Sequence, residues 1–260
     1  MEPTLTVFES KFKIESKPFN AEVDTTIPRQ VGLAGSSAIE TAFILALMAH
    51  NDIPLYTLSP RELAELVLKV EVEELGMVAG LQDRLPQAFG CMLHMDFKQE
   101  LMEGRGYGEY SELKSRNLPP LWLAHAEEGK DSGETHSEVA ARWAAKDPKM
   151  VEIIRELANC AAQGVEAIKN GESTYLSMLI DTNFELRREL FGDQPLGQTL
   201  KAVLLARSLG SCAKQTGSGG AIFGIVPELA DDGKTEFAER AAAAFAEIGW
   251  TFHNKLDVGK

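Results

Sequence analysis

The order of apolar and polar positions predicts a short strand near the start of the chain and a long helix after it. Phe12 and Ile14 alternate with charged residues, a period of two that is typical of a half-exposed strand. A turn with one proline and two glycines follows at 28–35, and the apolar run behind it predicts a helix that ends near His50. A capping box at 59–62 predicts a further helix that ends before Gly76.

The second half of the chain mixes helical and strand patterns. Asp147-Pro148 predicts the start of a long amphipathic helix, which Asn170-Gly171 ends. The other ranges with these patterns are helices over 172–191, 197–209 and 234–248, and strands at 121–127, 221–226 and 250–256.

A polar, glycine-rich stretch at 100–118 interrupts the pattern and is the candidate domain boundary. Strands and helices mix without strict βαβ alternation, so we expect an α+β protein with two domains, residues 1–117 and 118–260. The sequence contains no internal repeat.

The composition and net charge narrow the kinds of partner that this protein can bind. The 260 residues carry a formal net charge of −13, which argues against a nucleic-acid backbone or an anionic membrane as the main partner. A locally positive site for a small anion remains compatible with that charge.

The longest apolar stretch, Ala42–Ala49, is far below the roughly 18 residues of a membrane span, and no secretory signal is visible. Three widely spaced cysteines predict reduced thiols and a cytoplasmic protein.

The first candidate for chemistry is the glycine turn that leads into the first long helix. A helix N-terminus exposes unpaired N–H groups beside the positive end of the helix dipole, which suits phosphate oxygens. A serine hydroxyl would add a contact to phosphate or Mg²⁺, and the alternative is a serine N-cap after an ordinary turn. The residues concerned are Gly32, Leu33, Ala34, Gly35, Ser36, Ser37 and Ala38.

A second glycine-rich loop precedes the predicted strand at 221–226. Three glycines in four positions disfavour regular structure, so the loop would gain from bare backbone that approaches a phosphate or a sugar closely. A tight turn into the strand is the alternative. The loop consists of Thr216, Gly217, Ser218, Gly219 and Gly220.

Carboxylates supply a third candidate. Asp83 beside Arg84 would orient or deprotonate a substrate hydroxyl, and a surface ion pair is the alternative. Upstream, Glu71, Glu73 and Glu74 lie at the end of a predicted helix. One of them would hold Mg²⁺, or the three form a solvated acidic face.

Several segments, in order, resemble one enzyme superfamily. PRQVGLAGSSA (28–38) resembles the second signature of the GHMP kinases, and KQTGSGGA (214–221) resembles their third. Within that superfamily the amino-acid sequence of these segments is most similar to that of plant-type glucuronokinases, which phosphorylate D-glucuronate at C1 with ATP. The similarity extends over LGMVAGLQDRLPQAFG (75–90), HMDF (94–97), LPPLWLAHAE (118–127), DSGETHSEVAARW (131–143) and NFELRRELFGD (183–193).

The resemblance implies a fold and a role for each candidate. The N-terminal ATP-binding domain would resemble domain 2 of ribosomal protein S5, and the C-terminal domain would be ferredoxin-like. ATP phosphates would lie at 32–38, with Mg²⁺ held near Ser37 and by Glu73, and the glycine loop would close over the site. Asp83 would be the catalytic residue that accepts or aligns the hydroxyl proton. Contacts to the sugar acid are implied for Arg84, Asp131, Ser132, His136, Arg187 and Arg188.

No segment like the first GHMP signature precedes Pro28, so we expect an N-terminal domain that is incomplete at its start. The expected function is an ATP- and Mg²⁺-dependent sugar-1-kinase of carbohydrate metabolism, feeding UDP-glucuronate synthesis. The alternatives are a catalytically impaired nucleotide-binding remnant and a GHMP kinase that acts on another sugar. The expected partners are a sugar acid and ATP, with no nucleic acid and no membrane, and the oligomeric state stays open.

Overall fold

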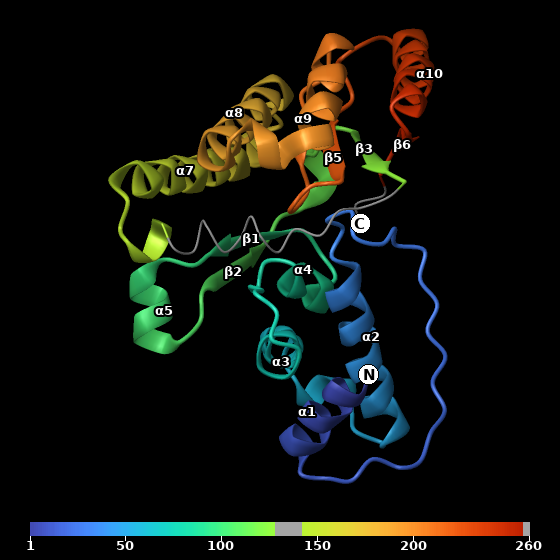
Figure 1. Cartoon of the computed structure of the whole chain (residues 1–260), viewed down its shortest axis with the longest axis vertical. Helices are drawn as coiled ribbons and strands as arrows, with labels where there is room; N and C mark the ends of the chain where they lie inside the picture. The colour runs from blue at the N-terminus through green and yellow to red at the C-terminus, as the bar shows by residue number, and fades with distance from the viewer. Residues whose placement is uncertain (128–141, 257–260) are drawn as a thin grey trace. The chain divides into compact units, whose positions relative to one another are not determined.

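The computed structural model describes residues 1–127 and 142–256, which divide into two compact units (Figure 1). The first unit comprises Met1–Ile27 and Ala34–Leu113, and the second comprises Pro28–Leu33 and the chain from Lys114 onward. A short piece of the N-terminal third therefore belongs to the second unit. Both units combine helices and strands, which confirms the expected α+β class.

The first unit consists mainly of helices around one apolar core. The helices are α1 (Glu2–Phe12), α2 (Gly35–His50), α3 (Pro60–Lys69) and α4 (Arg84–Phe89). Phe8, Ile44, Met48 and Val67 are fully buried where α1, α2 and α3 meet. The predicted helix that ends at His50 is confirmed.

The start of α3 confirms the predicted capping box. The Glu62 backbone N–H donates to the Ser59 hydroxyl, and the Ser59 backbone N–H donates to the Glu62 carboxylate over 2.9 Å. These two bonds satisfy orphan donors at the helix start. A wider helical turn, Val70–Glu74, continues α3.

The strand predicted around Phe12 and Ile14 is wrong, because Glu2–Phe12 forms a helix. Thr4, Val7 and Phe8 are its buried residues, at the i, i+3 and i+4 spacing of one helix face. The alternating residues only begin where this helix ends, at a left-handed Lys13. The alternation of apolar and charged residues at 11–15 was therefore the end of a helix, whose buried residues lie earlier in the sequence.

The polar stretch at 100–118 is more ordered than predicted. An antiparallel hairpin pairs β1 (Leu93–Asp96) with β2 (Glu109–Glu112), and α5 (Gln99–Arg105) lies between the two strands in sequence. A Cβ at Gly108 would lie 2.5 Å from the Asp96 carbonyl oxygen. This glycine therefore permits a close backbone approach inside the hairpin, within the stretch that the composition marked as the candidate domain boundary.

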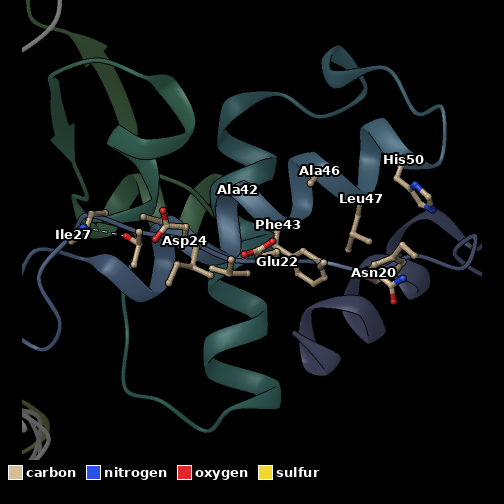
Figure 2. A pocket seen from close by; sticks show the side chains of 15 residues that line it. Asn20, Glu22, Asp24, Ile27, Ala42, Phe43, Ala46, Leu47 and His50 are labelled. Carbon is tan, nitrogen blue, oxygen red and sulfur yellow. Dashed lines mark hydrogen bonds between the residues drawn. The ribbon is translucent and has the colours of Figure 1, made fainter.

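A groove of about 600 Å³ lies in the first unit between α2 and the extended segment at 19–27 (Figure 2). Ala42, Phe43, Ala46 and Leu47 of α2 line one side, and apolar surface dominates the lining. Ala38, in the first turn of α2, also lines this groove, so the predicted phosphate-binding segment borders it.

The second unit is a four-stranded antiparallel sheet with helices packed on it, and the strand order is β4-β5-β3-β6. The strands are β3 (Leu121–Ala126), β4 (Lys214–Gln215), β5 (Ala221–Ile225) and β6 (Trp250–His253). The helices are α7 (Pro148–Asn170), α8 (Ser173–Phe191), α9 (Asp193–Ser208) and α10 (Asp231–Glu247). The strands and helices predicted for this half are confirmed, with α9 beginning earlier than expected and kinked at Gly197.

Alternation along β5 assigns its residues to two apolar clusters. Phe223 and Ile225 join the cluster built from α7 and α8, while Ile222 joins the cluster of α9 and α10 around the buried Trp122. Successive side chains of a strand point to opposite faces of the sheet, so a strand that is buried on both faces contributes to two apolar clusters in turn. The strand AIFGIV is apolar throughout for that reason.

Among the described helices, none is long and apolar enough to cross a membrane. The three cysteines carry free thiols, and burial raises the pKa of Cys160 and Cys212, so these two thiols stay protonated at neutral pH.

Candidate active site

The glycine turn and the glycine loop meet in the second unit, backbone against backbone. The Thr216 hydroxyl donates to the Gly32 carbonyl oxygen over 2.9 Å. A Cβ at Gly32 would lie 2.7 Å from the Gly219 carbonyl oxygen, and the φ of Gly32 is +76°. Only glycine adopts this left-handed backbone without strain and also leaves room for the Gly219 carbonyl oxygen. Two segments 184 residues apart in sequence therefore pack closely here.

The loop is also held from its other side. A Cβ at Gly220 would lie 2.9 Å from the Val31 Cα, and the Gly220 N–H donates to the Thr199 hydroxyl of α9 over 3.1 Å. This packing is compatible with a tight turn and with a ligand-binding loop. Both require that another group approaches the backbone of the loop closely.

The first turn of α2, in the first unit, lacks a side-chain cap. Ala34 precedes the helix in a left-handed conformation, and no side chain accepts a hydrogen bond from the first N–H groups. The fully buried Ser37 hydroxyl donates to the Ala34 carbonyl oxygen over 3.1 Å and accepts from Gln87 over 3.1 Å. The serine N-cap that was the alternative for Ser36 and Ser37 is therefore not formed.

Glu71 is fully buried next to these serines. Its carboxylate accepts from the Ser36 hydroxyl over 3.1 Å and from Arg84 Nε over 2.6 Å, with Arg84 Nη2 bonded to the same oxygen. Arg84 also donates to the Gly80 carbonyl oxygen over 2.8 Å, and its side chain is 6% exposed. Because Arg84 is committed to these partners, the structure places it as a support for Glu71 more than as a group open to a sugar.

Asp83 directly precedes α4 and keeps its carboxylate accessible. Its side chain is 41% exposed and lies 3.3 Å from Arg84 Nη1. The guanidinium thus contacts two carboxylates, one buried and one open to solvent. An oriented and accessible carboxylate is suited to accept a hydroxyl proton.

The structure separates the acidic residues that the sequence grouped together. Glu73 is 61% exposed and pairs with Lys69 at 3.7 Å, so Glu71, not Glu73, adjoins Ser36. Within residues 1–127 and 142–256, no group of three or more His, Cys, Asp or Glu side chains is arranged to hold a metal ion. Ser36 and Glu71, which are hydrogen-bonded to each other, carry oxygen atoms of the kind that Mg²⁺ takes from proteins.

The sugar contacts implied by resemblance have different surroundings. Arg187 donates from Nη2 to the Gly217 carbonyl oxygen over 3.0 Å and so lies at the glycine loop. Arg188 instead forms a two-pronged pair with Asp193 and a second pair with Glu185. Asp131, Ser132 and His136 lie outside the described residues.

Sequence reasoning named Glu71 in a group of three but chose Glu73, and it did not single out Lys214. Glu71 follows Val67 by four residues, so it continues the buried helix face, and this spacing was the available signal. Lys214 stands in β4 immediately before the glycine loop, where no spacing rule distinguishes it from a surface lysine.

Comparison with known proteins gives a family match for the first third of the chain and similar sequences over most of it. Residues 3–91 match the family described as GHMP kinases N terminal domain. Glucuronokinase 1 of Arabidopsis thaliana is 39% identical over 221 residues, which cover 85% of this chain and 60% of the Arabidopsis protein. The chain therefore spans about 60% of the length of that relative.

Solved structures show the same fold. Lactococcus lactis galactokinase, in complex with galactose, matches with a TM-score of 0.69 and 14% identity over 97% of this chain and 72% of that one. A Streptococcus pneumoniae phosphomevalonate kinase matches with a TM-score of 0.69 and 14% identity, over 94% and 77%. The resemblance drawn from the signatures is confirmed: residues 3–91 match the N-terminal domain of the GHMP kinases, the chain is 39% identical in sequence to an Arabidopsis glucuronokinase over 85% of its length, and it has the fold of these solved kinases.

Proposed function

We propose that this chain is an ATP- and Mg²⁺-dependent kinase that phosphorylates the anomeric hydroxyl of D-glucuronate. The observation that carries the proposal is the 39% identity to Arabidopsis Glucuronokinase 1 over 85% of this chain. The phosphomevalonate kinase of the same fold is described as a complex with phosphomevalonate and AMPPNP, which supports a nucleoside triphosphate as the phosphoryl donor.

The start of α2 is the proposed phosphate site. Its first N–H groups have no side-chain acceptor, and a 16-residue helix places the positive end of its dipole there. Anionic phosphate oxygens would accept from these donors. The buried Ser37 hydroxyl, fixed by Gln87, keeps the turn in this conformation.

Asp83 is the proposed catalytic residue. Its carboxylate would take the proton of the sugar hydroxyl while that oxygen bonds to the γ-phosphorus and the bond from phosphorus to the ADP oxygen breaks. Arg84 Nη1 donates to the Asp83 carboxylate over 3.3 Å and so holds it in place. Ser36 and Glu71 would hold Mg²⁺, which supplies charge neutralisation on the phosphates.

The test is turnover of the purified chain with Mg-ATP and a panel of sugars and sugar acids, measured as ADP release. We expect D-glucuronate to be the preferred acceptor. Asp83→Asn should lower kcat by about 10²- to 10⁴-fold with little change in KM, because proton transfer is lost and binding is kept. Asp52→Asn, which removes an exposed carboxylate paired with Lys17, is the matched control.

Each outcome decides between the candidate functions. Turnover that is equal in the wild type and Asp83→Asn contradicts the assigned role. Preference for a neutral sugar would identify a GHMP kinase with another substrate. Nucleotide binding without turnover of any acceptor would identify the nucleotide-binding remnant.

A further inference from the structure

Two cationic side chains lie together beside the glycine loop, and no carboxylate of the described residues pairs with either of them. Arg187 of α8 donates to the Gly217 carbonyl oxygen, and its Nε is buried with no hydrogen-bond partner. Lys214 lies three residues before Gly217, on β4, which packs against α8. Both side chains are half-buried, and cations removed from water are normally paired, so this arrangement is unusual in the described part of the chain.

The orientation of Lys214 places it on the α8 side of the sheet. Its cross-strand partner is Phe223, which packs in the cluster formed by α7 and α8, and Lys214 Nζ lies 5.4 Å from the centre of the Phe223 ring. Arg187 in turn lies over the Phe191 ring at 5.4 Å. Aromatic faces flank both cations, yet within the described residues Arg187 donates to the Gly217 carbonyl oxygen alone and Lys214 Nζ donates to no acceptor.

Carboxylates are abundant on α8, but they pair elsewhere. Asp181 binds Arg207 at 2.9 Å, Glu185 binds Arg207 and Arg188, and Glu189 binds Lys149 at 2.9 Å. In an acidic protein with a net charge of −13, a cation pair left without a carboxylate is a local exception to the charge of the chain.

The protonation behaviour agrees with this geometry. Burial, and then the charge of Arg187, lower the pKa of Lys214 to about 8. Burial also lowers the pKa of Arg187, and no neighbouring carboxylate opposes that effect. Both groups are therefore held in a site that disfavours their charge, which a bound anion would reverse.

We propose that Arg187 and Lys214 bind the carboxylate of a sugar acid, and this assignment rests on the proposed kinase function. A planar guanidinium next to an ammonium gives a carboxylate several charge-assisted hydrogen bonds. The position beside the glycine loop would direct the acid end of the sugar toward that loop.

Asn183 favours a sugar carboxylate over a nucleotide phosphate as the anion. It lies one helical turn before Arg187, and its side-chain oxygen is buried with no donor. A sugar acid carries hydroxyl donors close to its carboxylate, whereas phosphate oxygens at neutral pH mainly accept hydrogen bonds. One ligand with both groups would satisfy Asn183 and the two cations together.

The test is equilibrium binding without turnover, read as the shift of Tm by ligand. The probes are D-glucuronate, D-glucose, inorganic phosphate and ADP, added to the whole chain at pH 7. We expect D-glucuronate at about 100 times its Kd to raise the Tm of the wild type by roughly 5 °C, with D-glucose far weaker. Arg187→Gln and Lys214→Met should lose that shift. Arg155→Gln and Lys201→Met, which remove exposed cations, should keep it.

The Tm without ligand gives a second readout, because removal of a half-buried charge that has no carboxylate partner among the described residues should raise this Tm. Lys214→Met should therefore melt higher than the wild type without ligand and gain nothing from D-glucuronate. The assignment is overturned if D-glucuronate stabilises all variants equally, or if it does not stabilise the wild type. It is also overturned if the variants lose only the Tm shift that phosphate or ADP causes. A variant that does not fold would overturn it as well, since the cations would then hold the unit together. Binding as described in a chain without kinase activity would refute the kinase function alone.

Discussion

Two arginines in this protein illustrate opposite ways to bury a guanidinium. Arg84 has the Glu71 carboxylate, the Asp83 carboxylate and the Gly80 carbonyl oxygen as acceptors, so its charge is compensated on several sides. Arg187 has one carbonyl oxygen and an unpartnered Nε. A compensated ion pair fixes the position of the catalytic candidate Asp83, whereas an uncompensated cation keeps binding capacity for a ligand.

The pKa of Lys214 makes stability depend on pH in a defined direction. The folded chain has a lowered pKa of about 8, against 10.5 for an ordinary lysine, so the unfolded chain binds more protons between these values. The penalty for burying the charge is full below pH 8 and fades as pH rises toward 10.5. Lys214→Met should therefore exceed the wild type in unfolding free energy by up to about 3 kcal/mol at pH 7, and by progressively less above pH 8.

Urea unfolding between pH 7 and pH 10 measures this difference. Lys201→Met, at an exposed position on α9, should show almost no difference from the wild type at any pH. A Lys214→Met difference that stays constant across the range would contradict the lowered pKa.

At the scale of the element, the glycine loop is defined by what it packs against. The loop residues approach Val31 and Gly32, and the Thr216 hydroxyl bonds to the Gly32 carbonyl oxygen. A side chain on either segment would separate them. The glycines therefore serve a packing role that is independent of any ligand.

Gly32→Ala tests that packing role against a matched glycine. Gly32 and Gly171 have φ values of +76° and +71°, but a Cβ at Gly171 meets nothing within 4 Å. Both substitutions should cost about 1 kcal/mol for the left-handed backbone, and Gly32→Ala about 1–3 kcal/mol more for its contact with Gly219. Urea unfolding checks this, and equal losses at the two sites would show that the close approach is unimportant.

At the scale of the whole molecule, the chain passes between its two units three times. Pro28–Leu33 belongs to the second unit, although the residues before and after it belong to the first. Val31 in this segment is 1% exposed, and Gly32 accepts the bond from Thr216. The second unit is therefore assembled from two distant parts of the sequence.

A cut between Leu113 and Lys114 should not separate the two pieces. With a protease site inserted there, we expect the cleaved fragments to elute together in size exclusion under native conditions, because Pro28–Leu33 stays packed in the second unit. They should separate in urea, and the uncut protein is the control. Native elution as two separate fragments would show that this segment contributes little to the second unit.

Local pattern was sufficient for much of the fold. The capping box before α3, the Asp147-Pro148 start of α7 and the apolar strand β5 follow from hydrogen-bonding and burial rules that act over a few residues. The ordered signatures also identified the superfamily. The helix α1 was missed because its core-facing residues gain burial only against α2 and α3.

The site depended on tertiary structure to a greater degree. The sequence by itself determined which segments carry chemistry, since glycine turns, serines and an Asp-Arg pair are local features. Only the fold decided that Glu71 contacts Ser36 while Glu73 is exposed. It also decided that Arg188 pairs with a carboxylate whereas Arg187 has none among the described residues. The physical reason is that burial and pairing are properties of the space around a side chain, which is filled by residues far away in sequence.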